Sequence, residues 1–255
     1  MAQNAFIFSK RTAAIQKACK DRCEFVFIDA PHVLEIPTEA GSFEKFDSAA
    51  IPNSSGETDP KLVPRCWWRA NRNESGLTEF VGFDETMEYL RKVLDEQGPF
   101  QACLGFSQGA ALAAILSTAI ENPNVHPAFS RPPALTQDRF RSVVLVSGFR
   151  MDVPEKWYIN PNSDDRKLRT KSLHVLGRSD LIVGEDRSLP LIDCFKEARV
   201  EWHDGGHFVP STKNWRTFFS EYLHSFDEVE GSTVPSPTAA TIQSSSKANE
   251  NDPKL

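Results

Sequence analysis

Short apolar runs alternate along this chain with longer segments in which apolar side chains recur at helical spacing. The clearest run, SVVLVS at residues 142–147, has a continuous apolar centre, which is typical of a strand covered on both faces of a sheet. Further strands are predicted at residues 24–28, 101–106, 172–176 and 200–203. Helices are predicted at residues 9–20, with Ser9 as the N-cap, and at residues 84–97, 108–120 and 212–226. This alternation predicts an α/β fold with a mostly parallel sheet flanked by helices.

The rest of the chain divides into long loops and a tail. Loops are predicted at residues 37–64, 121–137 and 151–170, and we expect them to form walls over a cleft. Residues 228–255 contain no aromatic side chain and are rich in Ser, Thr, Pro, Ala and Asn, so they cannot bury enough apolar surface to offset their ordering entropy. We therefore predict one domain at residues 1–227, followed by a disordered tail at residues 228–255.

Composition and charge argue against several classes of protein. The 255 residues are 40% hydrophobic and 25% charged, with a net charge of −6, as in an ordinary globular domain. The chain has no Lys/Arg-rich run of the kind that binds nucleic acid. No apolar run approaches the roughly 20 residues of a spanning helix, and no secretory signal is apparent, so we expect a cytoplasmic protein with no membrane partner. Five cysteines without a C-x-x-C pair favour reduced thiols over disulfides or a zinc site.

The strongest functional motif is GFSQG at residues 105–109, which matches G-x-S-x-G. A predicted strand precedes it and an apolar helix follows, which is the setting of a nucleophile elbow. There the serine occupies a sharp turn, and small residues on either side let the backbone pass closely. Ser107 is therefore the candidate nucleophile, and the backbone N–H of Gln108 the candidate oxyanion donor. The alternative is an ordinary glycine-rich turn in which the serine caps the helix.

A catalytic serine needs a base, and His207 is the best candidate among six histidines. It follows two glycines after the last predicted strand, where a tight loop can present an imidazole over the sheet edge. His174 and His203 lie within predicted strands, and His224 lies near the end of the last helix. A metal site at His203 and His207 is disfavoured, because a loop with glycines lacks the helical register of i, i+4 ligands. The alternative for His207 is a loop histidine bonded to backbone.

The base needs an acid to orient it, and Asp180 is the best candidate. It lies in the loop after the penultimate predicted strand, from which a carboxylate can reach a histidine in the loop after the last. The order Ser107, Asp180, His207 is that of α/β-hydrolases. Competing carboxylates nearby are Glu185, Asp186 and Asp204, and Asp180 itself could be an Asx-turn residue.

With these motifs in place, the chain resembles the FSH family of serine hydrolases over about residues 3–226. The segments that carry the resemblance are residues 27–32 (FIDAPH), 67–68 (WW), 98–100 (GPF), 105–110 (GFSQGA), 147–149 (SGF), 173–177 (LHVLG) with Asp180, and 205–210 (GGHFVP). The resemblance implies an α/β-hydrolase fold with Ser107 as nucleophile, Asp180 as orienting acid and His207 as base. Family members hydrolyse carboxylic esters and thioesters, and fungal members often release or trim polyketides.

The resemblance also shows one departure at the N-terminus. The family opens with an apolar strand and a His-Gly-containing turn before a Gln-Asn pair, which Gln3 and Asn4 match here. That strand would lie beside the elbow strand, and its turn would supply a second oxyanion donor, whose loss costs about 10²–10³ in turnover in a known case. The alternative hypothesis is therefore an incomplete sequence or a catalytically impaired pseudo-enzyme or interaction protein. Residues 5–8 could form a substitute strand, although the family places them in the first helix.

These observations predict acyl transfer in two steps, from a small-molecule ester or acyl thioester to Ser107 and then to water. No metal or organic cofactor is required. A carrier domain of a polyketide synthase is a further expected partner, because a polyketide would arrive as a thioester. Four aromatic residues could line an apolar acyl pocket, with core packing as the alternative: Phe106, Phe149, Trp157 and Phe208.

Overall fold

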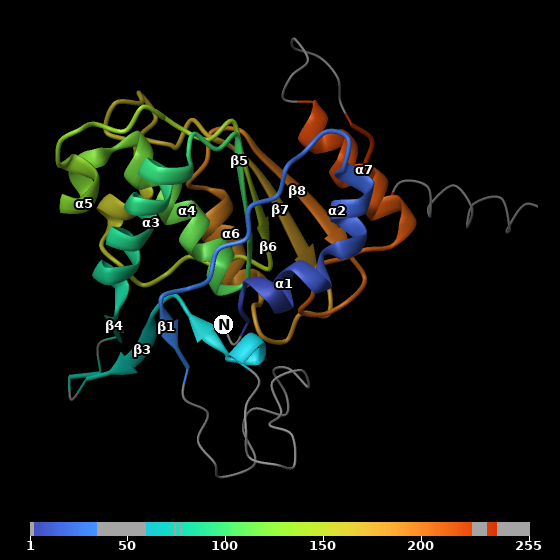
Figure 1. Cartoon of the computed structure of the whole chain (residues 1–255), viewed down its shortest axis with the longest axis horizontal. Coiled ribbons are helices and arrows are strands. Elements are labelled where there is room, and N and C mark those ends of the chain that lie inside the picture. The colour runs from blue at the N-terminus through green and yellow to red at the C-terminus, as the bar shows by residue number, and fades with distance from the viewer. Residues whose placement is uncertain (1–2, 35–59, 74, 77, 226–233, 239–255) are drawn as a thin grey trace, which may run out of the picture.

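The computed structural model describes residues 3–34, 60–73, 75–76, 78–225 and 234–238. Its centre is a parallel four-stranded sheet (Figure 1). The strands, in their order across the sheet, are β5 (Ala102–Phe106), β6 (Ser142–Val146), β7 (Lys171–Gly177) and β8 (Ala198–His203). Four of the five predicted strands are therefore confirmed. Because all four run in the same direction, their carboxyl ends meet at one edge of the sheet.

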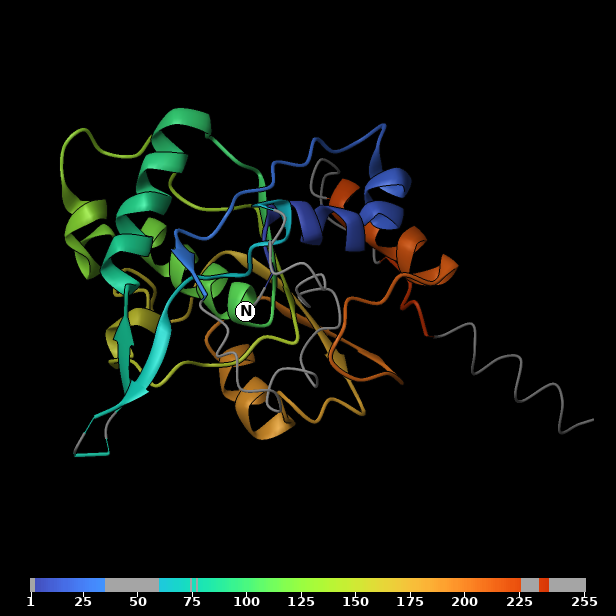
Figure 2. The same cartoon turned by 60° about the horizontal axis from the view of Figure 1, so that its bottom comes forward.

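Helices cover both faces of this sheet (Figures 1 and 2). The core on one face contains Val143 and Leu145 of β6, and the core on the other face contains Val144 and Val146. The alternation explains why the whole run is apolar: every residue of β6 is buried. The first core is closed by α3 (Phe83–Gln97), α4 (Gln108–Glu121) and α6 (Glu185–Ile192), and the second by α2 (Ala13–Cys19) and α7 (Lys213–His224). This arrangement confirms the predicted α/β fold.

The first helix begins earlier than predicted. It forms α1 (Ala5–Arg11), ends at Thr12 and is followed by α2. The N-cap is Asn4, whose Oδ1 accepts a hydrogen bond of 2.8 Å from the Ile7 N–H. The prediction of Ser9 as N-cap is wrong, because the Ser9 hydroxyl lies inside α1 and donates to the carbonyl of Phe6. Residues 5–8 are helical, as the family resemblance implies, and do not form a substitute strand.

The strand predicted at residues 24–28 does not form. These residues follow α2 as an extended segment without strand pairing (Figure 1), and within the described chain β5 pairs only with β6. The aromatic side chains of this segment pack on one another and on α1, with ring centroids 6.2 Å apart for Phe25 and Phe27 and 6.1 Å apart for Phe8 and Phe27. A run of aromatic and β-branched residues favours an extended backbone, but a strand also needs a partner for its N–H and C=O groups.

Two short antiparallel pairs lie outside the central sheet. β1 (His32–Val33) pairs with β2 (Arg65–Cys66), and β3 (Arg69–Arg72) pairs with β4 (Thr78–Val81). Figure 2 shows β3 and β4 projecting from the body of the molecule. All four residues of β3 are exposed, so this hairpin carries no hydrophobic alternation that would have predicted it.

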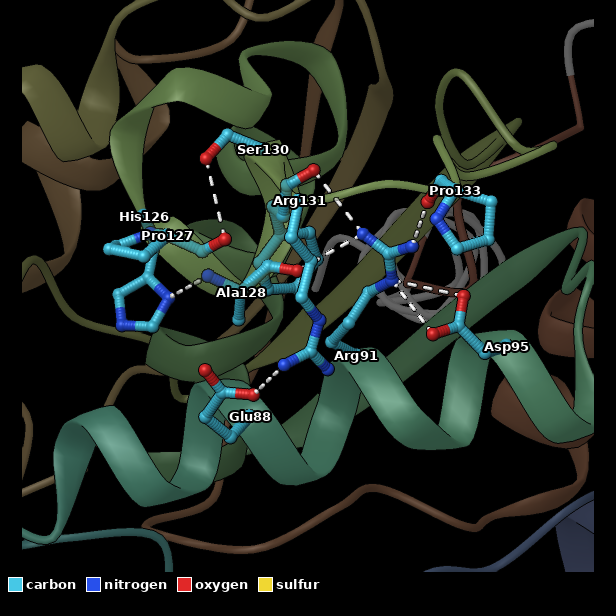
Figure 3. A network of polar contacts seen from close by, with 10 residues as sticks. Glu88, Arg91, Asp95, His126, Pro127, Ala128, Ser130, Arg131 and Pro133 are labelled. Atoms are coloured by element: carbon cyan, nitrogen blue, oxygen red, sulfur yellow. Dashed lines mark hydrogen bonds and ion pairs between the residues drawn. The ribbon is translucent and has the colours of Figure 1, made fainter.

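The three predicted loops contain short helical turns. These turns are η2 (Pro60–Leu62), η3 (Pro123–Val125), α5 (Pro127–Ser130) and η4 (Glu155–Tyr158). Residues 37–59 of the first loop lie outside the described residues. The loop at residues 121–137 packs along α3, where the buried Arg91 binds Asp95 at 2.9 Å and donates to the carbonyls of Ala128, Phe129 and Pro133 (Figure 3). This loop therefore packs along α3, and the expectation that it walls a cleft stays a prediction.

A short segment beyond α7 returns to the sheet. Val234 is buried in the second core, and its carbonyl accepts a hydrogen bond of 2.7 Å from Arg199 of β8. The Ser236 hydroxyl donates to the Glu201 carboxylate at 2.6 Å. Residues 234–238 fall within the predicted tail, whose other residues from 239 onward lie outside the described part of the chain, so the boundary at residue 227 stays a prediction. Among the described helices, none combines the length and apolar character needed to cross a bilayer.

Candidate active site

Ser107 occupies the sharp turn between β5 and α4. Its backbone has φ 55° and ψ −118°, a conformation that non-glycine residues rarely adopt and that functional sites often retain. Its N–H donates to the carbonyl of Val146 on the neighbouring strand at 2.9 Å, which holds the turn against the sheet. A Cβ at Gly105 would lie 2.2 Å from the carbonyl oxygen of Gly109, so only glycine lets β5 approach α4 this closely. The G-x-S-x-G motif thus lies in the predicted strand–turn–helix setting.

Gln108 is the first residue of α4, directly after Ser107. The first N–H groups of a helix have no intrahelical acceptor, and together they present partial positive charge beside Ser107. The buried side chain of Gln108 accepts a hydrogen bond from the Trp67 N–H at 3.0 Å and donates to the Trp68 carbonyl at 2.9 Å. It thereby ties the segment between β2 and β3 to the elbow. The WW pair belongs to the family resemblance, but its spacing in the sequence does not predict this contact with Gln108.

Asp180 and His207 form a close pair at the same edge of the sheet. His207 Nδ1 lies 2.8 Å from Asp180 Oδ2, and the two side chains are 15% and 3% exposed. Asp180 Oδ1 accepts two further hydrogen bonds of 2.9 Å, from the N–H groups of Ile182 and Val183. Three donors thus converge on one carboxylate.

The competing carboxylates have other surroundings. Glu185 and Asp186 lie in the exposed first turn of α6. The Asp204 carboxylate is 91% exposed and faces Arg178 at 3.6 Å. Only Asp180, among the carboxylates weighed from the sequence, is hydrogen-bonded to His207.

The hydrogen bonds keep Asp180 ionised. Burial by itself raises the pKa of this carboxyl, but the bonds from Val183, His207 and Ile182 outweigh burial and hold the pKa below its ordinary value. An ionised Asp180 accepts from the N–H at Nδ1 of His207. That tautomer leaves Nε2 of His207 unprotonated, which is the form that a general base requires.

His207 also lies beside the end of the elbow strand. Its ring centroid is 4.8 Å from that of Phe106, the residue before Ser107. The structure therefore brings Ser107, Asp180 and His207 to one sheet edge. The Ser107 hydroxyl and the His207 ring are not hydrogen-bonded to each other among the described contacts, and such catalytic contacts often tighten only when substrate binds.

The other histidines weighed from the sequence lie elsewhere. His174 is buried in β7 beside Ser172 at 3.0 Å, and burial lowers its pKa to about 3. His203 is buried at the end of β8, and His224 is the last residue of α7. Within the described residues no group of three or more His, Cys, Asp or Glu side chains could hold a metal ion.

The four aromatic candidates for an acyl pocket fall into two groups. Phe106 contacts the His207 ring, Phe208 is 48% exposed beside it, and Phe149 lies half-buried 4.2 Å beneath the Arg187 guanidinium. Trp157 instead belongs to the core, where its ring packs 5.2 Å from Phe83. The prediction that Trp157 lines the site is wrong, because its ring is enclosed between α3 and the loop after β6.

A small cavity borders the acid loop. Its volume is about 150 Å³, and it lies between the ends of β7 and β8 and helix α6, with Leu176, Asp180, Ser188 and Trp202 among its lining residues. Neither Ser107 nor His207 lines it.

A serine on a strained turn between β5 and α4, with an Asp–His pair in the loops after β7 and β8, is typical of the α/β-hydrolase fold. Solved structures agree: the chain is similar to SOBER1 of Arabidopsis thaliana, with a TM-score of 0.53 and 14% identity over 89% of this chain and 95% of that one. It is also similar to a Bacillus cereus carboxylesterase, with a TM-score of 0.50 and 14% identity over 88% and 84% of the two chains. At this identity the likeness shows the fold alone.

Sequence comparison identifies the family. Residues 1–219 match the serine hydrolase (FSH1) family. The esterase OVCA2 of Danio rerio is 33% identical over 232 residues, which cover 88% of this chain and 93% of that protein. The human esterase OVCA2 is 32% identical over 228 residues, covering 87% and 91% of the two chains. The chain belongs to the FSH1 family of serine hydrolases, which confirms the family resemblance.

Proposed function

We propose that this protein hydrolyses carboxylic esters or thioesters through an acyl-enzyme at Ser107. The observation that carries the proposal is the 2.8 Å contact between Asp180 and His207 at the sheet edge that also carries the strained Ser107. This is the arrangement of a nucleophile, a base and an orienting acid. The esterase names of the OVCA2 relatives support the same reaction class.

In the first step, Nε2 of His207 takes the hydroxyl proton of Ser107 as Oγ attacks the carbonyl carbon. The negative charge moves to the carbonyl oxygen, where the backbone N–H of Gln108 and the N-terminus of α4 stabilise it. Collapse of the intermediate breaks the bond to the leaving alcohol or thiol, which receives the proton from His207. Asp180 stabilises the imidazolium formed in between and keeps the ring in the required tautomer.

In the second step, water loses a proton to His207 and attacks the acyl-enzyme. The acid is released and the Ser107 hydroxyl is restored. Neither step needs a metal or an organic cofactor, because the proton carriers and the charge-stabilising groups belong to this chain.

Exposed apolar side chains favour an apolar acyl group. Leu181 and Ile182 follow the acid and are 98% and 37% exposed, and Phe208 follows the base at 48%. Large exposed apolar residues that follow Asp180 and His207 in the chain offer contact area to a hydrocarbon chain. A polyketide thioester on a carrier domain of a polyketide synthase is one substrate of this kind. The rate of release from the carrier domain, compared with the rate of hydrolysis of a simple ester of the same acid, distinguishes a carrier-bound substrate from a free ester.

The test of the proposed function is labelling of the purified protein by a fluorophosphonate, beside the Ser107→Ala variant. We expect labelling of the native chain at Ser107, identified by mass spectrometry, and hydrolysis of short-chain aryl esters. We expect Ser107→Ala to lose labelling and at least about 10³-fold of the hydrolysis rate. A native chain that does not label would favour the alternative of a non-catalytic interaction protein.

A further inference from the structure

His203 is a buried histidine placed four residues before the candidate base. It is the last residue of β8 and is 4% exposed. Its ring packs against Phe208, with centroids 4.9 Å apart, and edge-on against Trp215 of α7 at 5.9 Å. The ring therefore lies inside the loop that presents His207, between that loop and the second core.

The hydrogen bonding of His203 defines its charge state. Nδ1 accepts from the N–H of Gly205 at 3.2 Å, so Nδ1 carries no proton and the neutral ring carries its proton at Nε2. Nε2 is buried and has no hydrogen-bond partner among the described residues. Burial lowers the pKa of His203, although the charges of Asp180 and Asp204 oppose the shift. A buried donor without a partner is costly, so its retention calls for an explanation.

The backbone around His203 connects the loop of the base to the loop of the acid. The His203 carbonyl accepts from the Arg178 N–H at 2.8 Å, and the Gly205 carbonyl accepts from the Ser179 N–H at 3.1 Å. Both bonds end in the loop that carries Asp180. The N–H of Gly205 is thus bound by the imidazole of His203, and the carbonyl of Gly205 is bound by the loop that carries Asp180.

Close packing keeps the imidazole in this position. Gly177 pairs with His203 across β7 and β8, and a Cβ at Gly177 would lie 3.1 Å from Cε1 of the ring. The same Cβ would lie 2.5 Å from the carbonyl oxygen of Gly206. The ring fills the space that this glycine leaves, so the loop carrying His207 folds directly onto it.

We propose that His203 is a positioning residue for the Asp180–His207 pair. Its neutral imidazole acts as a hydrogen-bond acceptor for the Gly205 N–H and so orients the Gly205–Gly206 turn from which His207 projects. His203 touches no substrate and transfers no proton in this role. The inference rests on the proposed function, in which His207 is the base.

Two variants of equal size separate the acceptor from the bulk of the ring. In His203→Asn, Oδ1 stands near the position of Nδ1 and can accept from the N–H two residues on, as in an Asx-turn. In His203→Leu the side chain has a similar shape but no acceptor. Both variants remove the outer ring atoms and so lose similar packing against Phe208 and Trp215. They differ in whether the side chain can accept the hydrogen bond from the Gly205 N–H. His174→Leu, at a buried histidine of β7, controls for loss of an unrelated imidazole.

We expect His203→Asn to retain kcat within about threefold of the native value and His203→Leu to lower it by about 10-fold or more, with KM unchanged in both. A second readout is the proton NMR signal of the Nδ1–H that His207 donates to Asp180. It should persist in the native protein and in the Asn and His174→Leu variants, and broaden or disappear in His203→Leu. This readout needs no turnover, so it stays informative if the proposed function fails.

Equal losses in the Asn and Leu variants would overturn the proposal, because packing alone would then account for them. A persistent His207 signal in His203→Leu would also overturn it. Thermal unfolding of each variant shows whether it is folded at the assay temperature. If His203→Leu is unfolded there, His203→Gln, whose amide cannot adopt the Asx-turn, takes its place and is expected to lose the signal.

Discussion

Among single residues, Asp180 shows most clearly how surroundings select a role. Several carboxylates lie near it in sequence, but only Asp180 receives two backbone N–H donors as well as His207. The donors lower its pKa against the effect of burial, so it is ionised at neutral pH. An ionised acid fixes the tautomer of the base and balances the charge that the base acquires.

Asp180→Asn should remove this charge while keeping the side-chain shape. We expect kcat/KM to fall by about 10³–10⁴-fold, since an amide favours the wrong tautomer of His207. Asp186→Asn, at an exposed carboxylate in the same region, should leave kcat/KM unchanged. Ester hydrolysis by the two purified variants provides the measurement.

The Asp180→Asn variant also tests the lowered pKa of Asp180. Because the folded pKa of Asp180 lies below its ordinary value of 3.8, the ionised carboxylate stabilises the native state above pH 3.8. This contribution disappears as the pH falls through 3.8 toward the lower folded value. The difference in melting temperature between the native protein and Asp180→Asn should therefore stay constant well above pH 3.8 and narrow as the pH falls through and below 3.8. A difference that stays constant below pH 3.8 as well would contradict the lowered pKa.

At the scale of elements, the junction of β5 and α4 decides the backbone geometry of Ser107, the proposed nucleophile. The two glycines of the G-x-S-x-G motif have different roles there. A Cβ at Gly105 would meet the backbone of Gly109 and Ala110 at 2.2 to 2.6 Å, whereas a Cβ at Gly109 would meet only Trp67 Nε1, at 3.6 Å. Gly105 permits a close approach of backbone to backbone, whereas the space around Gly109 would also accommodate a Cβ.

Gly105→Ala should therefore lower the free energy of unfolding by about 3 kcal/mol or more, because the backbone must move apart. Gly109→Ala is the matched control, and we expect it to change this free energy by less than about 1 kcal/mol, since alanine is a better helix former. Urea unfolding of both variants provides the comparison. Equal losses in the two variants would show that the close approach at Gly105 is not what the motif requires.

At the scale of the whole molecule, the carboxyl ends of the parallel strands carry the proposed site, and the outer strand β8 receives a segment from beyond α7. The carboxyl ends of β5, β7 and β8 lead into the loops of Ser107, Asp180 and His207. Residues 234–238 return to β8, where Val234 is buried in the second core and Ser236 binds Glu201. This segment contributes apolar contacts to a domain that composition predicted to end at residue 227.

Val234→Ala should lower the free energy of unfolding by about 2 kcal/mol, because two buried methyl groups are removed. Pro235→Ala, at the exposed neighbouring position, should change it by less than about 1 kcal/mol. Chemical denaturation of the full chain measures both. No loss for Val234→Ala would mean that the segment contributes nothing to stability and would support a domain ending at residue 227.

The sequence by itself determined the features that depend on neighbouring residues along the chain. Four strands, the buried helix α4 and the elbow around Ser107 follow from hydrophobic periodicity and glycine spacing, which are local properties. The family also follows from the sequence, because its motifs are short and specific. Asp180 and His207 could be proposed from their positions after the last two strands, since parallel strands bring those loops together.

Only the tertiary structure decided what depends on contacts between distant residues. The extended segment at residues 24–28 forms no strand, because no described strand pairs with it. Trp157 lies in the core, although an aromatic side chain is also typical of an apolar pocket. Val234 is buried, although the composition of its segment is typical of a disordered tail. The role inferred for His203 rests on its contacts with Gly205, Phe208 and Trp215. Burial and hydrogen-bond pairing are properties of the assembled fold, so periodicity cannot specify them.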